Sequence, residues 1–120
     1  MKDYEKLIVW QKGHDNATLV YNFTKYFPKE ERYGITSQIR RAVVSVPTNI
    51  AEGCGRFTQS DFARYLQIAF GSAQEVEYLS LLSFELGYLK EEQYIKTNAL
   101  INEVKAMLIS LLKTIRTKKI

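Results

Sequence analysis

Apolar side chains recur at three- and four-residue intervals through four long stretches of this 120-residue chain, and only two prolines and six glycines interrupt them. This spacing is typical of helices that bury one face. No stretch alternates cleanly between apolar and polar residues as a half-buried strand does. The sequence predicts helices over residues 7–26, 37–53, 59–86 and 91–116 in a single domain, residues 1–120. Because the connections are short, we expect an all-α, antiparallel up-down four-helix bundle.

The first predicted helix has one seam of residues spaced three and four apart. We expect this seam to face the core. It comprises Leu7, Trp10, His14, Ala17 and Tyr21, and Ile8, Val20 and Phe27 widen it. Because His14 lies in the seam, we expect a hydrogen-bonded structural histidine. Pro28 disfavours a helical conformation at the preceding residue, so the helix should end near Phe27.

The second predicted helix has a proline in its interior. Pro47 has no N–H, so the carbonyl of Val43 loses its helical partner. Two arrangements are compatible with the missing hydrogen bond: two helices with Pro47 in the first turn of the second, or one helix kinked at Pro47. The apolar phase is unbroken from Ile39 to Ile50, which favours one kinked helix. The hydroxyls of Ser45 and Thr48 are then the nearby groups that can serve the free carbonyl.

Capping residues mark the ends of the second helix. Thr36 or Ser37 can cap its start through a side-chain oxygen. Gly53 and Gly55 bracket its end, where glycine adopts a left-handed backbone at least cost. Both expectations concern local backbone geometry and are independent of the bundle.

The third and fourth predicted helices indicate further contacts. Thr58 can cap the third helix, with Asp61 as its reciprocal partner. Gly71 costs roughly 1 kcal/mol against alanine in a helix interior, so we expect a neighbouring backbone to approach it closely. The fourth helix has a heptad seam at Thr97, Ile101, Val104, Leu108, Leu111 and Ile115. Its apolar surface is wider than that seam, so part of it is expected to face another subunit.

Charge is unevenly placed along the chain, whose net charge is +4. Residues 65–104 carry two basic and six acidic side chains, whereas residues 105–120 carry five basic and no acidic ones. Such asymmetry favours an acidic partner such as RNA or DNA, although cations also complement the dipole of a last helix. The candidate nucleic-acid-binding residues are Arg40, Arg41, Arg56, Arg64, Arg116, Lys118 and Lys119.

Each candidate also has a purely structural interpretation. Arginines can pair with carboxylates such as Glu52, Asp61 or Glu75, within the bundle or between subunits. The tyrosines that can stack on bases can equally lie at subunit contacts. These tyrosines are Tyr33, Tyr65, Tyr78 and Tyr88.

The stretch TSQIRRAVVSVPTNIAEGCGR, with VWQK before it and DFARYLQIAFGSAQEVE after it, resembles the 23S rRNA-intervening-sequence protein family of small bacterial four-helix-bundle proteins. The resemblance extends over nearly the whole chain. Its central structural motif includes Pro47, Asn49, Glu52, Gly53 and Gly55. Asn16 and Lys90 depart from the pattern, which usually has an apolar residue on the first helix and a serine-type cap on the fourth.

The resemblance implies a ring-shaped homopentamer with no established enzymatic activity. More distantly, the chain is similar to accessory variability proteins of diversity-generating retroelements, which are basic pentamers that bind nucleic acid and a reverse transcriptase. We therefore predict a non-enzymatic homo-oligomer that binds structured RNA, ribosomal RNA in particular, or another nucleic acid. The alternative is a scaffold that binds a protein partner without nucleic acid, which the acidic third helix and the wide apolar fourth helix favour.

Residues suited to catalysis or metal binding are few. The chain has one histidine and one cysteine, which excludes zinc sites built from these ligands. We predict no catalytic residue, no metal and no cofactor. Cys54 lies between two glycines and could be an exposed thiol. A single cysteine fits a reducing compartment, and no apolar run is long enough to cross a bilayer, so a cytoplasmic protein without membrane contact is the expectation.

Overall fold

The structure, a computed structural model, describes residues 2–117. In this part of the chain it contains four α-helices, two short 3-10 turns and no strand. The helices are α1 (Ile8–Thr24), α2 (Ile35–Cys54), α3 (Gln59–Glu85) and α4 (Glu91–Thr117), and the turns are η1 (Tyr4–Lys6) and η2 (Lys29–Glu31). Every predicted helix is present, with its ends within two residues of the expected positions. No helix in the described range combines the length and apolarity needed to cross a bilayer.

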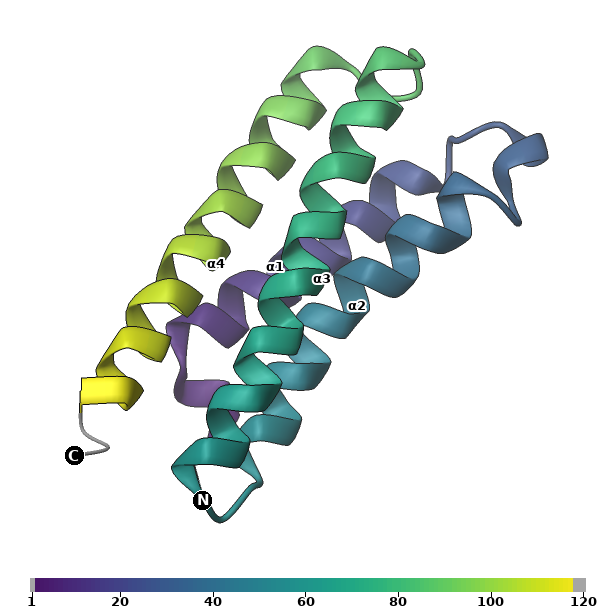
Figure 1. The fold of residues 1–120 in the computed structure, drawn as a ribbon. Helices are drawn as coiled ribbons and strands as arrows, with labels where there is room; N and C mark the ends of the chain where they lie inside the picture. Colours follow the sequence, from purple (N-terminus) through teal and green to yellow (C-terminus); the bar gives the residue numbers. More distant parts are fainter. Residues whose placement is uncertain (1, 118–120) are drawn as a thin grey trace.

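The four helices form an antiparallel bundle in which each packs against two neighbours (Figure 1). α2 lies between α1 and α3, and α4 closes the bundle by packing on α3 and α1. One end of the bundle holds the start of the chain, the α2–α3 connection and the end of α4 (Figure 1). There the backbone N–H of Lys2 donates to the carbonyl of Cys54 over 3.0 Å. The core is built from all four helices, and its fully buried side chains include Val20, Ile39, Ile50, Leu66 and Leu108.

α2 continues through Pro47 as a single helix, as its unbroken apolar phase predicts. Pro47 is buried and faces α1 at Gly13. A Cβ on Gly13 would lie 3.4 Å from Val46 Cγ1 and 3.7 Å from the Cβ and Cδ of Pro47. The small residue on α1 therefore lets the two helices pack closely at the proline.

Ser45, one of the two hydroxyl residues expected to serve the carbonyl freed by the proline, has other partners. Ser45 Oγ lies 2.7 Å from Ser72 Oγ on α3, in a hydrogen bond between the two hydroxyls. The amide of Asn49 donates to the carbonyl oxygen of Ser45 at 2.8 Å and to its Oγ at 3.0 Å. Asn49 thus orients Ser45, and this pair ties α2 to α3 instead of repairing the helix at Val43.

The predicted caps of α2 are wrong. The N-cap is Gly34, and both Thr36 and Ser37 lie inside the helix. Glu31 performs the capping role from η2, because its Oε1 accepts the N–H of Ile35 over 3.2 Å. An acidic side chain outside the helix can satisfy a free N–H as well as a capping hydroxyl can.

The glycines at the end of α2 do not adopt the left-handed backbone either. Gly53 is a buried helical residue, and Gly55 has φ −86°. Among the described residues, only Gly87, after α3, has positive φ, at 81°. The Thr58 cap of α3 is confirmed, since its Oγ1 accepts the N–H of Asp61 over 3.1 Å. No reciprocal bond from Asp61 to Thr58 is present within residues 2–117.

α1 faces the core with a stripe that agrees only in part with the predicted seam: Ala17 and Val20 are buried as expected, and Phe27 beyond the helix is buried too. The buried residues of the actual stripe are Val9, Gly13, Asn16, Ala17, Val20, Phe23 and Thr24. His14 and Tyr21 are exposed instead, and the ring of His14 stacks on Trp10 at 5.0 Å. α1 therefore has two seams at helical spacing, and the closely packed Gly13 decides which one faces inward. Asn16 is fully buried, and its amide finds no hydrogen-bond partner among residues 2–117.

Two details of α3 and α4 also differ from expectation. Gly71 is exposed, and a Cβ built on it would meet nothing within 4 Å, so no other helix among residues 2–117 approaches it closely. On α4 the buried seam follows the prediction, except that Leu112 takes the inward position expected for Leu111.

Candidate nucleic-acid interface

The candidate basic residues lie in two separate groups. Arg40 and Arg41 lie on the first half of α2, facing the side of the bundle formed with α1. A second group lies at the end of the bundle that holds the α2–α3 connection, and we call it the basic end: Arg56, Arg64 and Arg116, with Tyr65. Fifteen residues separate Arg41 from Arg56, about 20 Å along α2. Lys118 and Lys119 lie outside the described residues.

Tyr65 is the centre of the basic end. Arg56 Nη2 donates to the Tyr65 hydroxyl over 2.6 Å, and its guanidinium lies 4.6 Å from the ring centroid. The guanidinium of Arg64 lies 4.9 Å from the same centroid. Gly53 allows this arrangement, because a Cβ there would lie 3.0 Å from Tyr65 Cβ. The close packing of α2 on α3 thus holds two cations against one aromatic ring.

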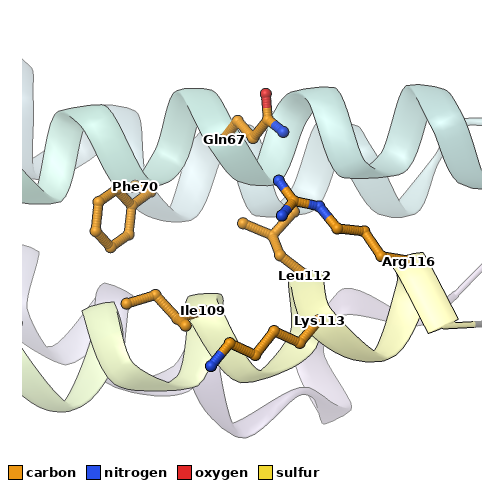
Figure 2. A pocket seen from close by; sticks show the side chains of 6 residues that line it. All are labelled: Gln67, Phe70, Ile109, Leu112, Lys113 and Arg116. Carbon is orange, nitrogen blue, oxygen red and sulfur yellow. The ribbon is translucent and has the colours of Figure 1, made fainter.

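Arg116 brings a third guanidinium to this end from α4. Arg64 and Arg116 line the same hollow of about 310 Å³. A neighbouring hollow of about 220 Å³ shares Arg116 and Gln67, and Figure 2 shows Arg116 reaching back from α4 past Leu112 toward Gln67 on α3. The floor of that second hollow is apolar, formed by Phe70, Ile109 and Leu112.

The surroundings of the basic end favour anions and stacked rings. Phe57, next to Arg56, is 89% exposed, which is unusual for a phenyl ring. The first turn of α3 begins here and adds the positive end of a helix dipole. Asp61 is the one carboxylate of the Arg64–Arg116 hollow, and its 4.0 Å ion pair with Arg64 is long and exposed, so it holds Arg64 only weakly.

Arg40 and Arg41 line a different feature, which we call the α1–α2 groove. The part of the groove beside Tyr21 and the first half of α2, which we call its upper part, has a volume of about 690 Å³. It is lined by three arginines, two tyrosines and no carboxylate: Tyr21, Arg32, Tyr33, Thr36, Ser37, Arg40, Arg41, Val44, Ser45, Thr48 and Asn49. Arg40 is held in place, because its Nε donates to Thr24 Oγ1 over 2.8 Å and its guanidinium lies 4.6 Å from the Tyr21 ring centroid. Arg41 is exposed and has no ion-pair or hydrogen-bond partner within residues 2–117.

The groove continues along the same face of the bundle. Its lower part has a volume of about 460 Å³ and shares Val44 and Thr48 with the upper part. Its α1 wall is formed by Trp10, His14 and Ala17. Together with Tyr21 in the upper part, these residues are the seam that the sequence predicted for the core. Glu52 of the structural motif lines the lower part of the groove.

Within the described part of this single chain, the candidate arginines form none of the carboxylate pairs considered as their structural alternative except that of Arg64 with Asp61; pairs between subunits stay a prediction. The other ion pairs of the described chain join Lys12 to Glu103 and Lys105 to Glu77. The hydrogen bond from Lys105 to Glu77, 2.8 Å long, holds the pKa of that carboxyl below its usual value. Both pairs join helices across the bundle and serve its packing.

Cys54 and His14 are placed differently from what the sequence predicts. Cys54 is buried, which contradicts the expected exposed thiol, and that burial raises the pKa of the thiol. Residues 2–117 contain no group of three or more histidine, cysteine, aspartate or glutamate side chains placed to hold a metal ion. His14 is too exposed for the structural role expected of it, and its contact is the stacked Trp10 ring.

Sequence reasoning missed two parts of these surfaces. Phe57 lies in the connection and belongs to no helical seam, so periodicity gave it no role; its position beside Arg56 was the available signal. The α1–α2 groove was missed because its α1 wall was assigned to the core.

The chain is similar in sequence and in fold to known proteins. A sequence model described as the 23S rRNA-intervening sequence protein family matches residues 5–110. A crystal structure of a protein of unknown function from the S23 ribosomal protein family of Bacteroides thetaiotaomicron is similar to this chain, with a TM-score of 0.82 and 30% sequence identity. The similarity covers 88% of this chain and 99% of that one. No match was found among curated proteins.

Proposed function

The chain belongs to the 23S rRNA-intervening sequence protein family, and from this premise we propose that it is a non-enzymatic homo-oligomer, a pentamer, that binds structured RNA through its basic end. The observation that carries the proposal is the convergence of Arg56, Arg64 and Arg116 at one end of the bundle. Guanidinium groups bind phosphate through two parallel hydrogen bonds, and each neutralised phosphate releases counterions.

The aromatic groups of the basic end suit RNA with accessible bases. Phe57 is almost fully exposed beside Arg56, and exposed aromatic rings stack on unpaired bases. Tyr65 is already covered by two guanidinium groups, so its role is to position them. The proposed ligand is therefore RNA with loops or bulges, such as a fragment of ribosomal RNA.

A filter-binding measurement with a ribosomal RNA fragment at several salt concentrations tests this function. Changing Arg56, Arg64 and Arg116 together to glutamine removes three positive charges from the basic end. Each lost phosphate contact lowers the slope of log K against log salt by roughly 0.7–0.9, so the slope should fall by about 2. If the chain binds duplex DNA as tightly as the RNA fragment, it recognises only the phosphate backbone. A preference for RNA with loops supports stacking of bases on Phe57.

The matched control changes the same number of charges at the opposite half of the bundle. It replaces Lys25, Lys29 and Lys96, which are exposed, with glutamine and should leave the slope nearly unchanged. If the slope of log K against log salt falls equally in the two triple variants, net charge alone drives binding. Absence of binding by the native chain at low salt would overturn the proposed function.

A further inference from the structure

The α1–α2 groove lies apart from the basic end, and its α1 wall is mainly aromatic and apolar. Its α1 wall is a complete helical seam, Trp10, His14, Ala17 and Tyr21. Such a seam normally covers a neighbouring helix. This seam is only partly covered within residues 2–117: Ala17 is buried and Trp10 packs against the core, whereas His14 and Tyr21 are exposed. The α1 wall extends over twelve residues, a rise of about 17 Å, which is enough for three turns of a partner helix.

The α2 side of the groove is shaped for close contact with a helix. Between Arg41 and Glu52 its outward residues are small or of medium size, namely Val44, Ser45 and Thr48. Val44 is 40% exposed although it is apolar. Three arginines stand at the upper part of the groove without a carboxylate among the lining residues. The expected occupant is therefore a helix with apolar, small and acidic residues on one face.

The outward face of α3 has this composition. Gly71 and Tyr78, seven residues apart, lie at its centre, opposite the stripe of α3 that faces the core. Ile68 is 42%, Tyr78 59% and Leu81 37% exposed. From Tyr65 to Leu89 the chain has three acidic residues and no basic one. Of these acids, Glu77 pairs with Lys105, whereas Glu75 and Glu85 have no ion-pair partner within residues 2–117.

Gly71 gives an independent indication that something approaches this face. A glycine in the middle of a 27-residue helix weakens that helix, and, its own helical backbone aside, no atom of the described residues lies within 4 Å of the position of its missing Cβ. By contrast, Gly13 and Gly53, the other glycines inside helices, each have a packed neighbour where a Cβ would lie. Close approach by a second molecule accounts for Gly71, just as contact with α2 accounts for Gly13 and contact with α3 accounts for Gly53.

We infer that the outward face of α3 in one copy of this chain occupies the α1–α2 groove of the next copy. The inference rests on the homo-oligomer in the proposed function and supplies the two surfaces of its contact. Gly71 lies against the small residues around Thr48, Tyr78 and Ile68 cover the α1 seam, and Glu75 and Glu85 face Arg41 and Arg32. These pairings join apolar to apolar surface and acid to base.

The outward face of α4 does not complement the groove in the same way. Lys96 lies on it, and a lysine would meet the arginines of the groove. Two different surfaces are used in the contact, so it is heterologous and leads to a closed ring or an open chain. This sets it apart from a two-fold contact, in which one surface meets its own copy.

Mixing two blocked variants tests this pairing directly. Thr48→Arg places a long cation in the groove, and Gly71→Arg places one on the α3 face; both positions are exposed. Each variant alone should have the mass of one chain, 13.9 kDa, by light scattering. Each still has one intact surface, so an equimolar mixture should form a dimer of about twice that mass and nothing larger. Ala99→Arg, at an exposed position opposite the core on α4, is the matched control and should assemble like the native chain.

Three outcomes overturn the inference. The first is a blocked variant that assembles like the native chain, and the second is a mixture that remains monomeric although circular dichroism shows both variants folded. The third is a monomeric native chain, which also removes the oligomer from the proposed function. RNA binding is measured separately at the basic end, so an assembled chain that binds no RNA leaves this inference standing while the proposed function fails.

Discussion

Replacing Gly71 with alanine should stabilise the single chain. Alanine is favoured over glycine in a helix interior by about 0.8–1.0 kcal/mol. The added methyl would meet nothing within 4 Å, so neither a packing gain nor a clash changes that figure. We therefore expect the free energy of unfolding to rise by about 1 kcal/mol, which corresponds to roughly 4 °C in Tm for a chain of this size.

The assay must exclude any contribution from assembly. Urea unfolding followed by circular dichroism is done in the Thr48→Arg background, at a concentration where light scattering reports single chains. Gly53→Ala is the matched comparison, because its Cβ would lie 3.0 Å from Tyr65 Cβ and 3.1 Å from Phe62 Cδ1. Overpacking of this kind costs about 1–3 kcal/mol, so this variant should be neutral or less stable despite the same gain in helix propensity.

The pair of glycine variants can refute the reasoning in either direction. A destabilised Gly71→Ala chain would mean that α3 is contacted at this point within its own chain. A Gly53→Ala chain stabilised by about 1 kcal/mol would mean that α2 and α3 are not closely packed at Tyr65. In that case the arrangement of arginines at the basic end would lose its support.

Two further predictions concern buried polar groups and the effect of pH. Thr97 is fully buried and its hydroxyl has no partner within residues 2–117, so Thr97→Val should raise the free energy of unfolding by about 1–2 kcal/mol in urea titrations. Thr24→Val should lower it, because the Thr24 hydroxyl donates to Val20 and accepts from Arg40. The lowered pKa of Glu77 stabilises the fold above the ordinary pKa of 4.5, and this contribution is lost as the pH falls through the folded pKa. Unfolding of Glu77→Gln, measured from pH 7 to pH 3, should therefore depend less on pH, with a loss of roughly 0.5 kcal/mol at pH 7.

Periodicity was sufficient to predict the helices and their antiparallel packing, because α2, α3 and α4 each have one dominant apolar face. It failed in part for α1, where the expected seam is offset by one residue from the buried stripe and shares Ala17 with it. Trp10 and Tyr21 are large aromatic residues at helical spacing, whereas the buried stripe contains Gly13 and Asn16, so spacing and size favoured the wrong seam. The deciding factor is the close contact of Gly13 with Pro47, a long-range contact that local spacing does not contain.

The candidate site could be predicted only as a set of residue types. Arginine at positions 40, 41, 56, 64 and 116 indicated anion binding, but the sequence does not show which of them meet. The structure joins Arg56, Arg64 and Arg116 through Tyr65 and a shared hollow, and it separates Arg40 and Arg41 from them. The capping errors have a similar origin, since Glu31 reaches Ile35 from outside the helix and no pattern within α2 reveals it.

The two proposed surfaces also constrain each other. The contact between copies uses the middle of α3, whereas the basic end lies at the start of α3, two helical turns from Gly71 at Arg64. Ile68, at the edge of this contact, is one turn from Arg64, so assembly leaves Arg56 and Arg116 away from the contact and Arg64 beside it. In a closed ring all copies are related by rotation about one axis, so every basic end lies at the same height on the same side. An RNA that reaches several subunits then gains from multivalency, and its binding becomes more sensitive to salt than that of one chain, because the phosphate contacts add. A chain with a net charge of only +4 can in this way form a strongly cationic surface without any single subunit being strongly basic.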